Sequence, residues 1–177
     1  AELHIAEAEE EYPDDPEGYW RDLRAKYFGN VTVLDRGIGP ILKALEESGQ
    51  ADNTIVVFTS DHGDSLGDRG MINKRAFYEE VARVPLIVHV PWISKSEQRV
   101  DGSIGHTDLV PTLLDLMGED VPDHLQGASR KDVLEGSDAL SDDVFMQWHG
   151  GAATVPLGNA EVERLSEIPW RCMVSGD

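Results

Sequence analysis

The sequence predicts an α/β fold, and three features carry this prediction. Residues 17–48 place apolar side chains at helical spacing, residues 54–60 form a continuous run of β-branched and aromatic residues, and a second apolar run spans residues 83–91. A helix followed by a short loop and a buried strand is typical of α/β proteins. With 177 residues, the chain has the length of one domain with a real core, or of a piece of one.

The first predicted helix contains a proline. Gly37-Ile-Gly-Pro40 interrupts the helical pattern, and proline suits the first turn of a helix but removes a hydrogen bond from a helix interior. The sequence is therefore compatible with one long helix or with two helices joined near Pro40. Gly49 follows the last helical residues and is a suitable C-terminal cap.

The two apolar runs are predicted to be buried strands, and the first of them to be buried on both faces, because it does not alternate with polar residues. The residues between them, up to Phe77, show neither a helical nor a strand period and contain several glycines. They are predicted to form a long loop, and long loops inside a compact domain are usually functional.

The C-terminal third is predicted to hold a short helix and two strands. Thr107 or Asp108 is a plausible N-cap, Pro111 falls in the first turn and Gly118 ends the helix. The segments DVFMQWHG and IPWRCMVSG are predicted to form an antiparallel pair of strands, joined by a polar connection that contains glycine.

Composition limits the classes of partner. The formal charge of −19, from 34 acidic and 15 basic residues, argues against a nucleic-acid-binding surface. No segment approaches the roughly 20 apolar residues of a membrane span, and the acidic N-terminus lacks the features of a signal peptide. We therefore expect a soluble protein; the compartment stays open, with the cytoplasm slightly favoured. The single cysteine, Cys172, excludes an internal disulfide and is predicted to be a small buried residue.

Asp61 and His62 directly follow the first predicted strand. Past the C-terminal end of a strand a turn can aim neighbouring side chains at one point, and open α/β sheets bind ligands at that end. Carboxylate oxygen and imidazole nitrogen both bind divalent metals. Taken alone, Asp-His-Gly is a weak signal, and an exposed capped turn is the better explanation of it. Asp64 and Asp68 are predicted either to support the metal loop or to be solvated turn residues.

A wider set of motifs resembles a known family. NTIVVFTSDHGDSLGDRGMINKRAFYEEVARVPLIVHVP at residues 53–91 is followed by HTDLVPTLLDLMG and LQGAS, and is preceded by LDRGIGPILKALEESGQAD. In this order the motifs resemble the C-terminal half of the sulfatase family, within the alkaline-phosphatase-like superfamily. The resemblance extends roughly from Tyr27 to Leu134.

The resemblance implies a particular architecture. We expect part of an alkaline-phosphatase-like sandwich, with a central, mostly parallel sheet flanked by helices and the start of a small C-terminal antiparallel sheet. Residues 1–138 would be the C-terminal part of the catalytic domain, and residues 139–177 the beginning of the small subdomain.

The resemblance also implies site residues. Asp61 and His62 match metal ligands, most often of calcium in sulfatases; the imidazole leaves manganese or another transition ion open. Lys74 matches the lysine that contacts the sulfate group, where its ammonium would offset charge that develops as the ester bond breaks. Arg83 and His106 lie in the matching stretch, and both are predicted to be structural.

The nucleophile motif of the family, Cys/Ser-x-Pro-x-Arg, and the early pair of aspartates that completes the metal site do not occur in this sequence. The resemblance therefore implies a C-terminal portion that is inactive alone and needs the N-terminal half of the same protein. Two ligands from one loop are too few for a tight calcium site of about six to eight ligands.

The function implied by the resemblance is metal-dependent hydrolysis of a sulfuric ester, with a small-molecule or carbohydrate sulfate ester as substrate. A phosphonate monoester or phosphodiester hydrolase of the same superfamily is the first alternative, and a non-catalytic acidic binding domain is the second. The presence of Asp61, His62 and Lys74 together argues against the second alternative. The sequence does not indicate the oligomeric state.

Overall fold

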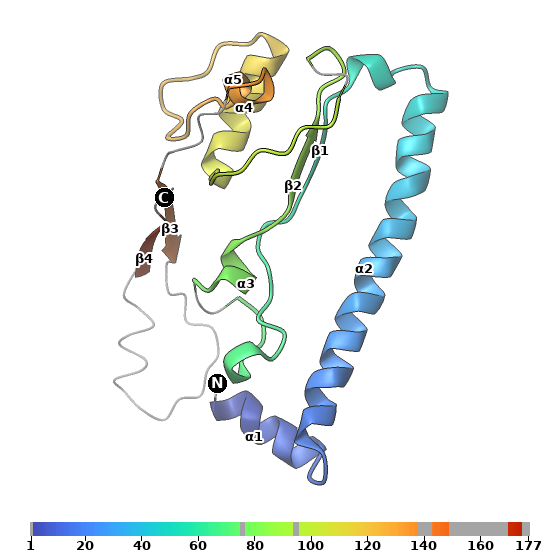
Figure 1. Cartoon of the computed structure of the whole chain (residues 1–177), viewed down its shortest axis with the longest axis vertical. Helices are drawn as coiled ribbons and strands as arrows, with labels where there is room; N and C mark the ends of the chain where they lie inside the picture. The colour runs from blue at the N-terminus through green and yellow to red at the C-terminus, as the bar shows by residue number, and fades with distance from the viewer. Residues whose placement is uncertain (1, 75–76, 94–95, 138–142, 149–169, 175–177) are drawn as a thin grey trace. The chain divides into compact units, whose positions relative to one another are not determined.

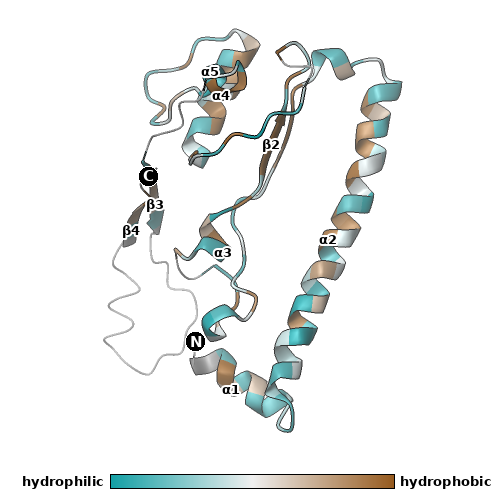
Figure 2. Ribbon diagram, viewed as in Figure 1, coloured by the Kyte–Doolittle hydropathy of each residue, from teal (hydrophilic) through white to brown (hydrophobic). Residues whose placement is uncertain are grey.

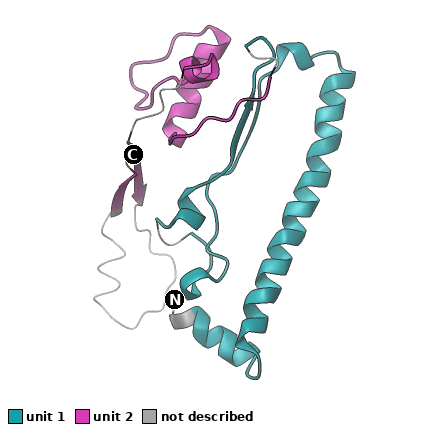
Figure 3. Ribbon diagram, viewed as in Figure 1, with its two compact units in different colours: residues 1–95 teal, residues 96–177 magenta. Residues whose placement is uncertain are grey.

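The computed structural model describes residues 2–74, 77–93, 96–137, 143–148 and 170–174. The chain divides into two compact units, residues 1–95 and residues 96–177 (Figures 1 and 3). The first unit contains the two N-terminal helices and the predicted loop. The second unit contains the predicted C-terminal helix and strand pair. Among the described residues, no helix combines the length and the apolar character needed to cross a membrane.

The first unit begins with two helices in sequence, α1 (Glu2–Glu11) and α2 (Pro16–Glu47). Pro16 occupies the first turn of α2, where its missing N–H costs nothing, and the Asp15 side chain accepts a hydrogen bond from Gly18 N at 3.1 Å. Tyr19 contacts Tyr12 edge to face across the turn between the helices. The acidic N-terminal segment is thus helical, which its weak apolar pattern did not indicate.

Helix α2 is one continuous helix of 32 residues that passes through Pro40, so the first of the two alternatives is correct. The residues around Pro40 are exposed, so water can satisfy the carbonyl group that loses its backbone donor. Gly49 has φ 71° and donates its N–H to Glu46 O at 3.0 Å, which confirms the predicted C-terminal cap. Apolar segments alternate with polar ones along the exposed helix (Figure 2).

Strands β1 (Val56–Thr59) and β2 (Leu86–His89) form an antiparallel pair in which Thr59 lies opposite Leu86. The prediction that these strands are buried was wrong, since Phe58 is 43% exposed and Ile87 is 62% exposed. A two-stranded sheet leaves much of both faces exposed. An apolar run therefore indicates that a strand can be buried, not that it is buried. The described residues form two antiparallel pairs of strands and contain no parallel pair.

The connection between β1 and β2 contains the predicted loop. It includes a 3₁₀ turn, η2 (Asp68–Gly70), and one helical turn, α3 (Glu79–Ala82). A second 3₁₀ turn, η1 (Ala51–Asn53), leads from α2 toward β1. Because β1 and β2 are antiparallel, the whole connection from residue 60 to residue 85 starts and ends at the same end of the strand pair.

The second unit confirms the predicted C-terminal elements. A 3₁₀ turn, η3 (His106–Asp108), leads into α4 (Leu109–Met117), which has Pro111 in its first turn and ends at Gly118 with φ 77°. After a short helix, α5 (Lys131–Leu134), strands β3 (Val144–Trp148) and β4 (Trp170–Val174) pair antiparallel. The predicted connection between these strands, and the predicted boundary at residue 138, lie outside the described residues. Cys172 on β4 is partly exposed, not buried as predicted, because its strand is one of only two in that sheet.

The core of the second unit contains a buried ion pair. Asp108 heads α4, but its carboxylate does not cap the helix; it accepts hydrogen bonds from Arg130 Nε and from Ala128 N, both at 2.9 Å. The two charged side chains are only 9% and 16% exposed. Thr112 Oγ1 accepts Arg130 N at 2.9 Å, so the segment before α5 is held against α4 by both backbone and side-chain groups.

We predict that Asp108→Ala destabilises the second unit, because it removes the buried carboxylate that accepts hydrogen bonds from Ala128 N and Arg130 Nε. The expected cost is about 3 kcal/mol, which corresponds to roughly 100-fold faster amide hydrogen exchange in α4. The exposed Asp120 is the matched control, and Asp120→Ala should change exchange less than about two-fold. Equal exchange rates in the two variants would contradict a stabilising role for the buried pair.

Candidate functional site

The candidate site begins where β1 ends. Ser60 follows the last strand residue, and its hydroxyl donates a hydrogen bond to His62 O at 2.8 Å. Asp61 Oδ1 accepts a hydrogen bond from His62 N at 3.0 Å, which curls the carboxylate back over the turn. The turn therefore places the two adjacent side chains on the same side of the backbone, as the sequence predicted.

The hydrogen bonds of His62 determine which ring nitrogen can bind a metal. His62 Nδ1 lies 2.7 Å from Gly63 O, and because a carbonyl oxygen only accepts, Nδ1 must carry the proton. In the neutral imidazole Nε2 then presents its lone pair, and this atom lies 3.3 Å from Asp61 Oδ2. One oxygen and one nitrogen that can each bind a metal thus lie next to each other.

This pair fits a divalent metal. Metal bonds of about 2.0–2.4 Å to oxygen and nitrogen place neighbouring ligands about 3 Å apart, close to the observed separation. The Asp61 side chain is 80% exposed, so ligands from elsewhere can reach the same ion. Within the described residues, no third histidine, cysteine or acidic side chain joins the pair, so these two residues could hold an ion only with additional ligands.

The charge on Asp61 is favoured by its neighbours. Partial desolvation raises the pKa of Asp61, but the positive charge that the His62 ring carries when protonated, the His62 N–H and the Lys74 ammonium hold that pKa below its usual value. Asp61 is therefore ionised at neutral pH, as a metal ligand must be. Lys74 is exposed, and it lies near enough to Asp61 for its charge to be felt there.

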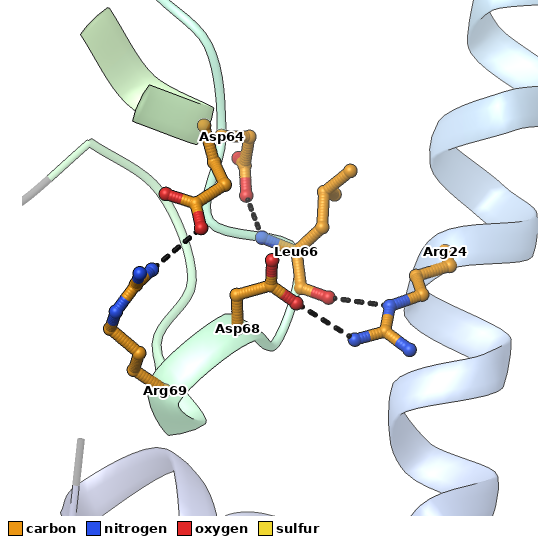
Figure 4. Close-up of polar contacts among 6 residues, drawn as sticks. Arg24, Asp64, Leu66, Asp68 and Arg69 are labelled. Carbon is orange, nitrogen blue, oxygen red and sulfur yellow. Dashed lines mark hydrogen bonds and ion pairs between the residues drawn. The ribbon is translucent and has the colours of Figure 1, made fainter. Parts of the chain in front are cut away.

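Lys74 lies near the start of the loop because residues 64–73 form a closed ring. Asp64 Oδ1 accepts hydrogen bonds from Leu66 N at 2.9 Å and from Asn73 N at 3.1 Å, while Ser65 donates its N–H and its hydroxyl to Asn73 O at 3.1 and 3.0 Å. The first of these bonds is drawn in Figure 4. The chain thus leaves the ring at the point where it entered, with Lys74 next to its closure.

Two arginines fix the outer part of the ring. Arg24 on α2 donates to Leu66 O at 2.8 Å and pairs with Asp68 at 3.3 Å (Figure 4). Arg69 lies 3.9 Å from the centre of the Tyr78 ring and pairs with Glu80 at 2.6 Å, which lowers the pKa of Glu80. The sequence did not indicate Arg24, because its partners lie more than 40 residues away and no local pattern links them.

The other acidic and basic residues that the sequence singled out stabilise the loop or lie at the exposed surface. Asp64 and Asp68 both support the loop. Arg83 pairs with Glu79 at 3.7 Å, with both side chains mostly exposed. His106 lies in the second unit, where it is the first residue of η3 and is exposed. We assign none of these residues a direct role in chemistry.

Gly63 allows the loop to pass against α3. Its N–H donates to Val81 O at 2.8 Å, and a Cβ atom at this position would lie 1.9 Å from Glu80 O. Since that oxygen belongs to the backbone, a side chain could be admitted only by moving α3 or the loop.

Several solved structures resemble the fold of this chain. The phosphonate monoester hydrolase SpPMH from Silicibacter pomeroyi matches with a TM-score of 0.69 and 34% identity, over 78% of this chain and 28% of that one. BT4656, solved with its substrate D-glucosamine-2-N,6-O-disulfate, matches with a TM-score of 0.64 and 38% identity, over 70% of this chain and 26% of that one. The fold is therefore that of the alkaline-phosphatase-like hydrolases, which confirms the predicted fold class.

The family follows from sequence comparison. The family model Sulfatase matches residues 2–119, and the N-acetylglucosamine-6-O-sulfatase of Bacteroides thetaiotaomicron is 44% identical over 117 residues. This match covers 66% of this chain and 20% of that enzyme. The chain belongs to the sulfatase family, as its motifs indicated. It spans less than a third of the length of the relatives it matches.

We predict that Gly63→Ala disturbs the site without unfolding α2. Overpacking against Glu80 O should cost about 1–3 kcal/mol and speed amide exchange at residues 61–65 by roughly ten-fold or more. Gly39→Ala is the matched control, since a Cβ at this helical position meets no atom within 4 Å and alanine favours the helix. Unchanged exchange in Gly63→Ala would show that the close approach is not a constraint.

Proposed function

We propose that this chain forms one side of the active site of a sulfatase, in which a longer protein hydrolyses a sulfuric ester with the help of a divalent metal. The observation that supports this most strongly is the proximity of Asp61 Oδ2 and His62 Nε2, 3.3 Å apart, at the start of a loop whose end, directly before Lys74, is hydrogen-bonded back to Asp64 and Ser65. A metal ligand pair next to a cation suits an anionic substrate.

Asp61 and His62 are the proposed metal ligands. Calcium is the expected ion, and the imidazole leaves manganese or another transition metal as the alternative. When bound, such an ion acts as a Lewis acid toward the oxygens of the ester. The chain's own residues would orient these ligands: the His62 N–H holds the Asp61 carboxylate in place, and Gly63 O fixes the His62 tautomer.

Lys74 is the proposed catalytic and substrate-binding residue of this chain. A lysine ammonium is a compact charge with three donors, so it can bind an oxygen of the sulfate group and offset the charge that develops as the ester bond breaks. Its exposed position leaves it free to contact a substrate.

The nucleophile and the remaining metal ligands are proposed to come from the additional sequence that the longer relatives contain. Exposed apolar side chains support this, because Phe28, Leu34 and Ile41 on α2 and Ile87 on β2 are all more than half exposed. Apolar groups of this size are normally covered in a folded enzyme. We expect the rest of the catalytic domain to cover them.

The proposed substrate is a small-molecule or carbohydrate sulfate ester. Among the relatives, one is named for N-acetylglucosamine 6-O-sulfate and another, from Rhizobium meliloti and 35% identical, is a choline-sulfatase. These names span both substrate types, so the ester group is better supported than the alcohol attached to it. A cytoplasmic location stays a sequence-based expectation.

Phosphonate monoester hydrolysis is the second candidate function. It is favoured by the similarity to SpPMH, whose TM-score of 0.69 exceeds the 0.64 of BT4656. Both reactions need a metal and a cation beside a tetrahedral anion, so the residues of this chain suit either one.

We predict that the chain alone binds Mn²⁺ or Ca²⁺ weakly, with a dissociation constant of about 0.1–1 mM or weaker, and hydrolyses no sulfate ester. In a calorimetric titration, Asp61→Ala should abolish binding, because it removes one of only two ligands. Asp52→Ala, an exposed aspartate in η1, should leave binding unchanged. Equal affinity in Asp61→Ala and the unmodified chain would reject the ligand assignment.

We predict that Lys74→Ala in the longer protein lowers kcat for an aryl sulfate by about 10²–10³-fold while metal content stays unchanged, because the lysine acts on developing charge and binds no metal. Steady-state kinetics with an aryl sulfate and an aryl phosphonate separate the two candidate functions. A strong preference for the phosphonate would replace the sulfatase proposal with the second candidate.

A further inference from the structure

Asp64 lies three residues after Asp61 but belongs to a different part of the loop. Its Oδ1 accepts two backbone N–H groups from opposite ends of the ring, Leu66 N at 2.9 Å and Asn73 N at 3.1 Å. Within the described residues, it does not join Asp61 and His62 in a cluster that could hold a metal. Its carboxylate is therefore used to hold the backbone.

The backbone that Asp64 holds is strained. Leu66, Arg69 and Asn73 have φ values of 47°, 56° and 65°, in the left-handed region that side chains other than glycine disfavour. For Leu66 and Arg69 this conformation costs about 1 kcal/mol or more and persists only where surrounding contacts enforce it, whereas asparagine adopts it more readily. Asn73 is the last residue before Lys74, so its backbone angles set the direction in which Lys74 leaves the ring.

We propose that Asp64 is a positioning residue of the site: by accepting Leu66 N–H and Asn73 N–H on one oxygen, it closes the ring of residues 64–73, holds Asn73 in its left-handed conformation and directs Lys74 toward Asp61 and His62. Hydrogen bonds to an ionised acceptor are about twice as strong as neutral ones, which suits a carboxylate to this task. The inference deepens the proposed function and rests on it for the role of Lys74, but it can be tested without metal or substrate.

The other contacts of the ring explain why Asp64 can be removed without unfolding the loop. Ser65 still binds Asn73 O through its N–H and its hydroxyl, and Arg24 still binds Leu66 O. These contacts leave Asn73 N without an acceptor in the absence of Asp64. Asn73 can then relax to an ordinary φ, which turns Lys74 away while the rest of the ring stays in place.

Zero-length cross-linking with a water-soluble carbodiimide measures this direction in the 177-residue chain. The reagent activates a carboxyl group, and an amine close to it displaces the urea to form an amide. Asp61 and Lys74 are both exposed, so both can react. Peptide mapping by mass spectrometry gives the yield of the Asp61–Lys74 product.

We expect Asp64→Ala to lower this yield about five-fold or more, because Lys74 samples many directions once the ring is released. Asp64→Asn keeps an oxygen acceptor in the same place and should restore the yield to within about two-fold of the unmodified chain. Asp68→Ala is the matched control, since it removes another carboxylate of the same ring, one whose ion pair with Arg24 is exposed and which accepts no hydrogen bond from Asn73; its yield should stay within about two-fold of the unmodified chain.

Three results would overturn the inference: a normal yield in Asp64→Ala, an equal loss in Asp64→Ala and Asp68→Ala, or no Asp61–Lys74 product in the unmodified chain. A loss in Asp64→Asn as large as in Asp64→Ala would also overturn it, because acceptance of the two N–H groups would then not be the cause. A separate Mn²⁺ titration of the unmodified chain tests the proposed function. If Mn²⁺ does not bind while cross-linking follows the expected order, the proposed function fails and the positioning role stands.

Discussion

The hydrogen bonds that join Asp64 and Ser65 to Asn73 are the constraint on which the candidate site depends. Asp61 and His62 need only a local turn to come together, but Lys74 lies thirteen residues beyond Asp61 in the sequence and is brought back toward it because the intervening chain is closed on itself. Closing a loop of this length costs conformational entropy. A few short bonds at its base, with Arg24 and Arg69 on its outer part, offset that cost and hold the end of the loop, next to Lys74, close to its start.

Charge gives the site its second constraint. A chain with a net charge of −19 repels anions, so binding of a sulfate ester requires a local region of positive charge. Lys74 and a metal held by Asp61 and His62 would create such a region within a small volume. The exposure of Asp61 suits a site completed by other parts of a sulfatase, because one loop supplies ligands for only part of a coordination shell.

The features that sequence predicted well are those set by local chemistry. The C-terminal glycine caps at Gly49 and Gly118, the loop after β1 and the pairing of β3 with β4 each depend on neighbouring residues or on simple periodicity. The convergence of Asp61 and His62 was predictable because they are adjacent at a strand end. Continuity of α2 through Pro40, partial exposure of β1 and β2, and the contact of Arg24 with the ring depend on tertiary packing, which periodicity does not report.

The antiparallel pairing of Thr59 with Leu86 has a practical consequence for protein engineering. Every residue proposed here to bind metal or anion, and every contact at the base of the ring, lies on the connection between these two positions. A connection that begins and ends on adjacent antiparallel strands can be moved between scaffolds as a cassette, because a recipient hairpin needs only the same strand spacing. Such a graft would also need the groups outside the cassette that the loop packs against, among them Arg24, which binds Leu66 O, and Trp20, which lies against Gly67.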